Sequence, residues 1–146
     1  MDLQLGGAKV VISGGSQGIG LEVAKTFLEE GATVQIAART ESKINEALEQ
    51  LSPFGSATGQ VCDVADYDTT VSWMQDAAAT MGGIDIVIHN ATASGLPDGG
   101  PQSWRSNFEV DLLGMVGMSE GALPYLEKSK RAALVQIASI TGIEHH

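Results

Sequence analysis

Closely spaced glycines and small polar side chains stand near the amino terminus, in the stretch SGGSQGIG at positions 13–20. Its glycines follow a G-x-x-x-G-x-G pattern. They allow a tight turn, close approach of backbone to a pyrophosphate, and close contact between a helix and a sheet. The N-terminus of the following helix offers N–H groups and the positive end of a dipole to phosphates. A dinucleotide site is therefore predicted, with a plain strand-to-helix turn as the alternative. The predicted contacts are Gly14, Ser16, Gln17, Gly18, Ile19 and Gly20.

A second candidate lies in AARTES, at the end of the next apolar segment. An enzyme that reads the adenosine ribose of NAD usually carries a carboxylate here. Ala37 and Ala38 offer none, and Arg39 follows them. An arginine can donate charge-assisted hydrogen bonds to a ribose 2′-phosphate, each worth about 1.5–3 kcal/mol. NADP is therefore predicted ahead of NAD. In the alternative, Arg39 is solvated or stacks on the adenine, and the preference is weak.

Alternating strands and helices must position these residues. Apolar runs predict strands at 8–13, 33–38, 57–62, 84–89 and 132–138. Helical periodicity predicts helices at 18–30, 41–51, 66–81 and 104–128. This alternation implies right-handed crossovers and a doubly wound α/β fold, a parallel sheet in the order 3-2-1-4-5. No linker or internal repeat interrupts the pattern, so one Rossmann-type domain over residues 1–146 is predicted.

The composition of the chain limits the classes of molecule that it is expected to bind. The chain has 146 residues, of which 43% are hydrophobic, and a formal net charge of -10. Nucleic acid and anionic membranes are poor partners for such a charge, and no apolar stretch approaches the roughly 20 residues that span a bilayer. The single cysteine, Cys62, has no partner for an internal disulfide and no metal-type spacing. A cytoplasmic protein without a metal site is therefore predicted.

Four motifs occur in order along the chain: SGGSQGIG, CDV after the third strand, HNA after the fourth and IASITG in the fifth. Together they resemble the short-chain dehydrogenase/reductase family over the whole chain. The resemblance implies hydride transfer between a nicotinamide cofactor and a small carbonyl or secondary alcohol, with this chain as the cofactor-binding part. A dinucleotide-binding or sensing module without chemistry is a second hypothesis. A structural protein that retains the fold without the cofactor is a third.

Carried over to this sequence, the resemblance places Asp63 and Val64 beside the adenine, with Asp63 accepting from its amino group. In the alternative, Asp63 is a turn or helix N-cap residue. Asn90 and Ala91 would line the central groove. His89, where the family often has another Asn, is expected to be a hydrogen-bonded strand-end histidine rather than a catalytic base.

The resemblance also assigns two catalytic positions. Ser139 corresponds to the serine that holds and polarises the substrate carbonyl, although by itself it would be an ordinary strand-end hydroxyl. Asp111 stands where the family commonly has an Asn that helps a proton relay. An Asp can accept the same hydrogen bonds but adds a negative charge, so the relay is in question.

The family's general acid, a Tyr about a dozen residues beyond the serine with a Lys four residues later, has no counterpart here. Seven residues follow Ser139. Tyr67 and Tyr125 precede it, with Val71 and Ser129 at the fourth position on. The 146-residue chain alone is therefore predicted to be inactive or nearly so.

Three further expectations concern the surface. Without later strands, the fifth strand would be an exposed apolar edge. The helix 104–128 carries more apolar surface than one core stripe needs, which predicts a homo-oligomer through that helix, with a plain core helix as the alternative. The irregular stretch 90–103 is expected to border the site, unless it is only a surface loop. The terminal EHH is either native sequence or part of a purification tag, and metal binding by its histidines is not expected.

Overall fold

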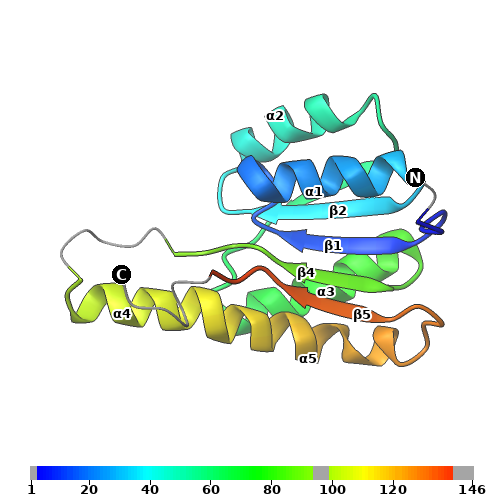
Figure 1. The fold of residues 1–146 in the computed structure, drawn as a ribbon. Helices are drawn as coiled ribbons and strands as arrows, with labels where there is room; N and C mark the ends of the chain where they lie inside the picture. Colours follow the sequence, from blue (N-terminus) through cyan, green and yellow to red (C-terminus); the bar gives the residue numbers. More distant parts are fainter. Residues whose placement is uncertain (1–2, 94–98, 140–146) are drawn as a thin grey trace.

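A parallel sheet with the strand order β3-β2-β1-β4-β5 forms the centre of the protein, as the sequence predicts (Figure 1). The structure is a computed structural model, and it describes residues 3–93 and 99–139. All described strand pairs are parallel, so the carboxyl ends of the strands meet at one edge. The strands are β1 (Lys9–Ser13), β2 (Thr33–Ala38), β3 (Ala57–Val61), β4 (Ile86–His89) and β5 (Ala133–Gln136).

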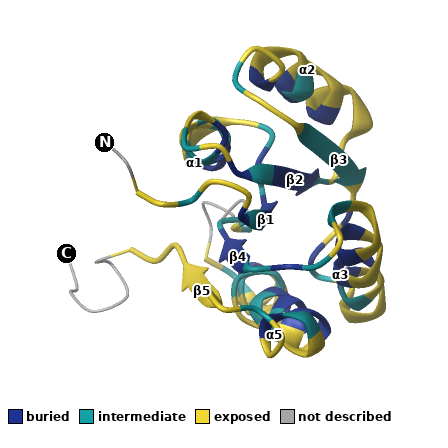
Figure 2. Cartoon of the chain, turned by 90° about the vertical axis from the view of Figure 1, so that its right-hand side faces the viewer, coloured by how far each residue is buried: buried dark blue, intermediate teal, exposed yellow. Residues whose placement is uncertain are grey.

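Helices cover the two faces of this sheet (Figures 1 and 2). On one face lie α1 (Gly18–Glu29) and α2 (Glu41–Leu51), and on the other lie α3 (Tyr67–Met81) and α5 (Gly114–Leu126). α5 continues from α4 (Pro101–Asn107) through η1 (Phe108–Leu113), a segment of π-helix. The layered α/β architecture is therefore the predicted one.

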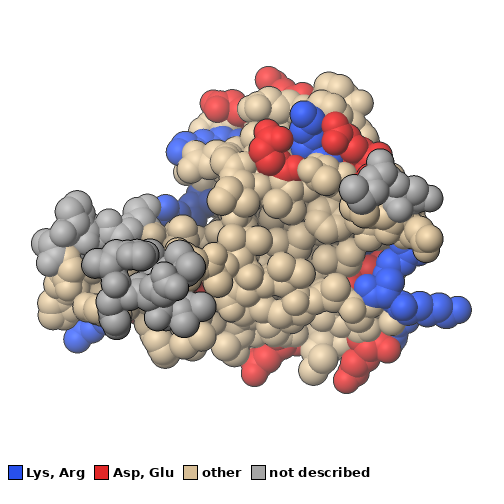
Figure 3. Space-filling view, in the orientation of Figure 1, with Lys and Arg blue, Asp and Glu red and all other residues tan. Residues whose placement is uncertain are grey.

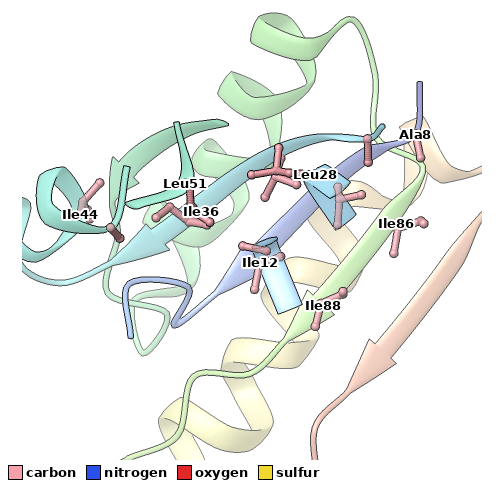
Figure 4. Packing of buried hydrophobic residues seen from close by; sticks show 13 residues of the cluster. Ala8, Ile12, Leu28, Ile36, Ile44, Leu51, Ile86 and Ile88 are labelled. Atoms are coloured by element: carbon pink, nitrogen blue, oxygen red, sulfur yellow. The ribbon is translucent and has the colours of Figure 1, made fainter. Parts of the chain in front are cut away.

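The alternation of side chains along β1 divides the core into two layers. Ile12 packs with Leu28 of α1 and Ile44 of α2 in the first cluster (Figure 4). Val11 points to the opposite face and packs with Trp73 of α3 and Met118 of α5 in the second cluster. Because helices bury both faces of β1, its apolar run is nearly continuous, which is the pattern expected of a central parallel strand.

The predicted helix 104–128 is wrong at both ends and in its regularity. The helical segment begins at Pro101, whose fixed φ suits a first turn, and it ends at Leu126. The π-helical η1 interrupts it, because side chains from outside the helix bond to backbone carbonyls in this segment. The start of α3 is better predicted: Asp66 caps this helix by accepting a hydrogen bond of 2.9 Å from the Thr69 amide.

The predicted exposed edge is confirmed. Leu134 and Val135 of β5 are 43% and 42% exposed, and Ile137 just beyond is 40% exposed. Figure 2 shows β5 as an exposed strand beside the buried β4. In the part of the chain that the structure describes, no helix is long and apolar enough to cross a membrane.

Charged side chains are distributed unevenly over the surface that Figure 3 shows. Acidic and basic side chains gather together at the top, over α1 and α2, and at the right-hand edge, whereas the broad central area is uncharged. Further basic side chains lie on the left-hand side and further acidic ones along the lower edge, so the basic side chains on this face do not form one continuous stripe.

Candidate functional site

A cleft of about 390 Å³ lies beyond the carboxyl ends of the central strands, at the edge where ligands of open α/β sheets bind. It brings together segments that are far apart in the sequence: the glycine turn, the ends of β2 and β3, and the start of the loop after β4. Its described lining consists of Gly14, Ser16, Gln17, Gly18, Ile19, Ala37, Ala38, Arg39, Thr40, Lys43, Cys62, Asp63, Val64, Asn90, Ala91, Thr92, Ala93 and Val110.

The glycine turn between β1 and α1 depends on the absence of side chains. Gly14 and Gly18 have positive φ values of 65° and 55°, which disfavour other residues. A Cβ on Gly18 would meet no heavy atom within 4 Å, so the backbone at Gly18 is open to the cleft. Gly20 lies below the lining, where a Cβ would stand 2.2 Å from the carbonyl oxygen of Gly14. Gly20 therefore allows the helix to contact the turn and does not line the cleft.

The amino-terminal end of α1 points its backbone amides at this space. Gln17 is the N-cap residue in extended conformation, and its side chain makes no capping hydrogen bond to the described residues. Its Oε1 instead lies 3.5 Å from the Nζ of Lys43 on α2. The first-turn amides and the positive helix dipole are thus available to an anion.

Two cations belong to the described lining near the end of β2, and no carboxylate does, since Glu41 in the first turn of α2 is not among those residues. Ala37 and Ala38 line the wall of the cleft, and the exposed Arg39 and Lys43 line its mouth. Residues 37–39 therefore line the cleft, and the contact of Arg39 with a 2′-phosphate stays a prediction. Lys43 was not predicted. Its position in the first turn of α2, four residues after Arg39, is the signal that could have revealed it.

Asp63 and Val64 form the wall beyond β3. The Oδ1 of Asp63 accepts a hydrogen bond of 3.0 Å from the amide of Ala65, as the alternative turn interpretation expects. The N-cap role belongs to Asp66 instead. The adenine contact of Asp63 thus stays a prediction.

Asn90 connects the two central strands at the floor of the cleft. Its Nδ2 donates a hydrogen bond of 3.0 Å to the carbonyl oxygen of Gly14, while Ala91 approaches that glycine so closely that a Cβ on Gly14 would lie 3.0 Å from the Ala91 backbone. Both predicted groove residues therefore line the cleft together with the glycine turn.

The predicted catalytic residues lie outside the described lining of the cleft. Asp111 belongs to η1, where its Oδ1 accepts from the Ala93 amide and its backbone carbonyl accepts from Nε2 of Gln136, each at 3.0 Å. Ser139 follows β5 and is exposed. Asp111 is thus tied to the loop after β4, and the catalytic role of both residues stays a prediction.

The sequence model of the short chain dehydrogenase family matches residues 8–146. The chain belongs to this family. The chain is 35% identical to isoepoxydon dehydrogenase patN of Penicillium expansum, with 97% of this chain and 56% of that protein covered. It is 31% identical to the uncharacterized oxidoreductase YvrD of Bacillus subtilis, over 99% of this chain and 56% of that protein.

Solved structures of the family share the fold. A short chain dehydrogenase from Mycobacterium smegmatis matches with a TM-score of 0.86 and 25% identity, over 97% of this chain and 62% of that one. A 7α-hydroxysteroid dehydrogenase complexed with NADH and 7-oxo glycochenodeoxycholic acid matches with a TM-score of 0.91 and 24% identity, over 99% and 58%. The chain therefore spans little more than half the length of these relatives.

Family membership identifies the cofactor class as NAD(P), and the residues of the cleft fit such a group. A Cβ at Gly18 would enter open space at the cleft, and the start of α1 supplies amides for a pyrophosphate. The lining also contains residues that the sequence did not single out individually: Thr92 and Ala93 of the stretch predicted to border the site, Thr40 and Cys62 next to predicted residues, and Lys43 and Val110, which the fold brings there.

The site shows no sign of a metal. Among residues 3–93 and 99–139, no three His, Cys, Asp or Glu side chains gather as ligands would. His145 and His146 lie outside the described residues, as do positions 94–98 of the long loop. At the described start of that loop, Thr92 and Ala93 line the cleft.

Proposed function

We propose that this chain is the cofactor-binding part of an NADP-dependent oxidoreductase that interconverts a small carbonyl compound and its alcohol. The observation that supports NADP is the pair of exposed cations, Arg39 and Lys43, at the mouth of a cleft whose β2 end carries no carboxylate. Two cations beside one ribose favour a 2′-phosphate by Coulomb attraction and by charge-assisted hydrogen bonds. A carboxylate at the same place would repel it.

In this proposal each part of the cleft holds one part of the cofactor. The open backbone at Gly18 and the amides of α1 hold the pyrophosphate, while Asp63 and Val64 border the adenine. Asn90 and Ala91 line the groove toward the nicotinamide. The bound cofactor supplies the hydride. Ser139 orients the carbonyl, and Asp111 takes part in proton transfer.

A binding or sensing module without turnover is the second candidate function. Neither Tyr67 nor Tyr125 is among the described lining of the cleft. The hydroxyl of Tyr67 donates to Glu120 across α3 and α5, and Tyr125 borders a separate hollow at the opposite edge of the sheet with Lys9 and Asp85. A positioned general acid typically contributes about 10²–10⁴-fold to the rate, so binding with background turnover is the expected behaviour of this module.

We also propose that the protein self-associates through α4, η1 and α5. Five large apolar side chains of the predicted helix 104–128 are well exposed, although Leu126 belongs to the core. The exposed fractions are 73% for Trp104, 52% for Phe108, 50% for Leu112, 37% for Val116 and 52% for Leu123. Such contiguous apolar surface is typical of protein interfaces.

The single, buried Cys62 agrees with a reducing compartment such as the cytoplasm.

The test is a fluorescence titration of the purified chain with NADPH and NADH. Arg39→Gln should weaken NADPH binding about ten- to a hundredfold, because it removes charge-assisted hydrogen bonds, and change NADH binding less than about threefold. Lys130→Gln is the matched control: it removes the same charge from an exposed residue far from the cleft, and should change neither affinity.

Three results decide between the candidates. Equal losses for both nucleotides in the Arg39 variant would contradict the NADP preference. Failure of the parent to bind either nucleotide would contradict both functions. Turnover with a panel of carbonyl compounds can exclude only the second candidate: oxidation of NADPH would contradict a module without chemistry, whereas binding without oxidation is expected of both, because the chain alone is predicted to be inactive.

A further inference from the structure

Ser13 and His89 end the adjacent strands β1 and β4, directly below the cleft. The two residues are register partners and are buried, with 0% and 1% of their surfaces exposed. The Ser13 hydroxyl oxygen lies 2.9 Å from Nδ1 of His89. The same oxygen accepts hydrogen bonds of 3.1 Å from the amides of Asn90 and Ala91. Ser13 thereby fixes the backbone of the segment that lines the cleft.

The partners of the imidazole determine where its proton is. Nε2 of His89 lies 3.0 Å from the carbonyl oxygen of Val110, and a carbonyl only accepts, so Nε2 carries the proton. The serine oxygen uses its two lone pairs for the two amides, so its own proton must go to Nδ1. The whole network therefore requires one neutral tautomer. Burial lowers the pKa of His89 and so favours the neutral form.

The same imidazole helps to shape η1. Two successive backbone carbonyls of this segment accept hydrogen bonds from side chains outside the helix. The carbonyl of Val110 accepts from His89, and that of Asp111 accepts from Gln136. The Asp111 carboxylate also accepts from the Ala93 amide at 3.0 Å. Side chains that insert into a helical ladder in this way widen it locally. The turn that carries Asp111 is thus held from the ends of β4 and β5.

The helix can approach the ring because Gly114 begins α5. A Cβ at Gly114 would lie 3.2 Å from Cε1 of His89 and 3.1 Å from Cγ2 of Val64. Both contacts are tighter than ordinary van der Waals contact. The histidine is thus enclosed by β1, η1 and α5, and its position is well defined.

We propose that neutral His89 is a positioning residue. It joins the floor of the cleft, formed by Asn90 and Ala91, to the η1 turn that carries Asp111. This role builds on the proposed dinucleotide site. Protonation of His89 at Nδ1 would direct an N–H at the Ser13 oxygen, which already accepts from two amides. The serine proton would then lose its acceptor on the imidazole. Asp111 of η1 is the charged group that faces the ring, since Ser13, Gly114 and Gln136 on the other elements carry no charge. The backbone of Asn90 and Ala91 should therefore loosen at acid pH.

The first test is calorimetric titration with NAD⁺ between pH 8 and pH 5, because NAD⁺ lacks the 2′-phosphate, which itself titrates near pH 6. Affinity of the parent for NAD⁺ should fall as the pH drops toward and below the lowered pKa of His89, by at most about tenfold per pH unit for one proton. In His89→Asn an amide oxygen at the level of Nδ1 can still accept from Ser13 but does not titrate, so this variant should lose most of that slope. The same slope in both proteins would overturn the proposal.

The second test does not depend on nucleotide binding. Amide hydrogen exchange of Asn90 and Ala91 at pH 7.5 should accelerate at least tenfold in His89→Phe and stay near the parental rate in His89→Asn. The amides of Val34 and Ile36 in β2 report global stability and serve as the control. If the Phe variant fails to fold, the calorimetric comparison of the parent with His89→Asn decides. The positioning role would be overturned if exchange of Asn90 and Ala91 stayed unchanged in His89→Phe, or accelerated there only as much as that of Val34 and Ile36. If the parent fails to bind NAD⁺ while the exchange pattern holds, the proposed function fails and the positioning role stands.

Discussion

Gly20 of α1 lies so close to Gly14 that a Cβ on Gly20 would stand 2.2 Å from the carbonyl oxygen of Gly14. The same carbonyl accepts the hydrogen bond from Asn90, so it cannot turn away without breaking the connection between β1 and β4. The glycine motif therefore contains two different requirements. Gly20 is needed for packing, whereas Gly18 leaves its space to a ligand.

Alanine substitutions should separate these requirements. Gly20→Ala should lower the free energy of unfolding by about 3 kcal/mol, because overpacking against backbone costs about 1–3 kcal/mol or more. Gly18→Ala should cost only about 1–2 kcal/mol for a left-handed residue, but lower the affinity for NADPH at least tenfold because the methyl group enters the cleft. Urea unfolding and fluorescence titration measure the two effects. The same ratio of stability loss to affinity loss in both variants would contradict this division.

The stability of the protein should depend on pH through His89. Burial lowers the pKa of the folded-state imidazole below its usual value, whereas the unfolded chain titrates at about 6.5. Between these two values the unfolded state binds the extra proton, so the free energy of unfolding should decrease as the pH falls below about 6.5. The slope for one proton is at most about 1.4 kcal/mol per pH unit.

Urea denaturation from pH 7.5 to pH 5 measures this dependence. His89→Asn is the control, since it keeps a polar strand-end side chain without the titrating group. Subtracting its profile removes the contribution of the carboxylates. A difference profile that is flat, or that rises toward acid pH, would show that the folded-state pKa is not lowered.

Sequence reasoning succeeded where local patterns decide the structure. The strand order follows from alternating apolar runs, and the positions of Gly14 and Gly18 follow from their spacing. It failed at η1, because this π-helical segment depends on His89 and Gln136, which lie 21 and 25 residues from the carbonyls that they contact. Lys43 was missed for a related reason: its place beside the glycine turn depends on how α2 packs next to α1.

Cys62 should react slowly with alkylating reagents despite its position at the cleft. The thiol is buried and 3% exposed, and burial raises its pKa, so little of the reactive thiolate forms near neutral pH. Alkylation by iodoacetamide at pH 8 should therefore be at least a hundredfold slower in the folded chain than in urea. Because the chain has one cysteine, intact mass reports the labelled fraction directly. Equal rates with and without urea would contradict the burial of this thiol.

Self-association should depend on the apolar side chains along α4, η1 and α5. Trp104 is 73% exposed and Phe108 is 52% exposed, and a buried aromatic of this kind often carries much of the affinity of an interface. Trp104→Glu places a charge in that interface, where desolvation without a partner is costly. Sedimentation equilibrium should show an oligomer for the parent and at least tenfold weaker association for the variant.

The control for this measurement is Val61→Thr, which makes a 49% exposed position more polar on β3, at the opposite edge of the sheet. It should leave the mass in solution unchanged, because β3 is remote from the proposed interface. A parent that sediments as a monomer would contradict self-association altogether. An oligomer that survives Trp104→Glu but dissociates in Val61→Thr would place the interface at β3, and an oligomer that survives both would exclude α4 as its centre.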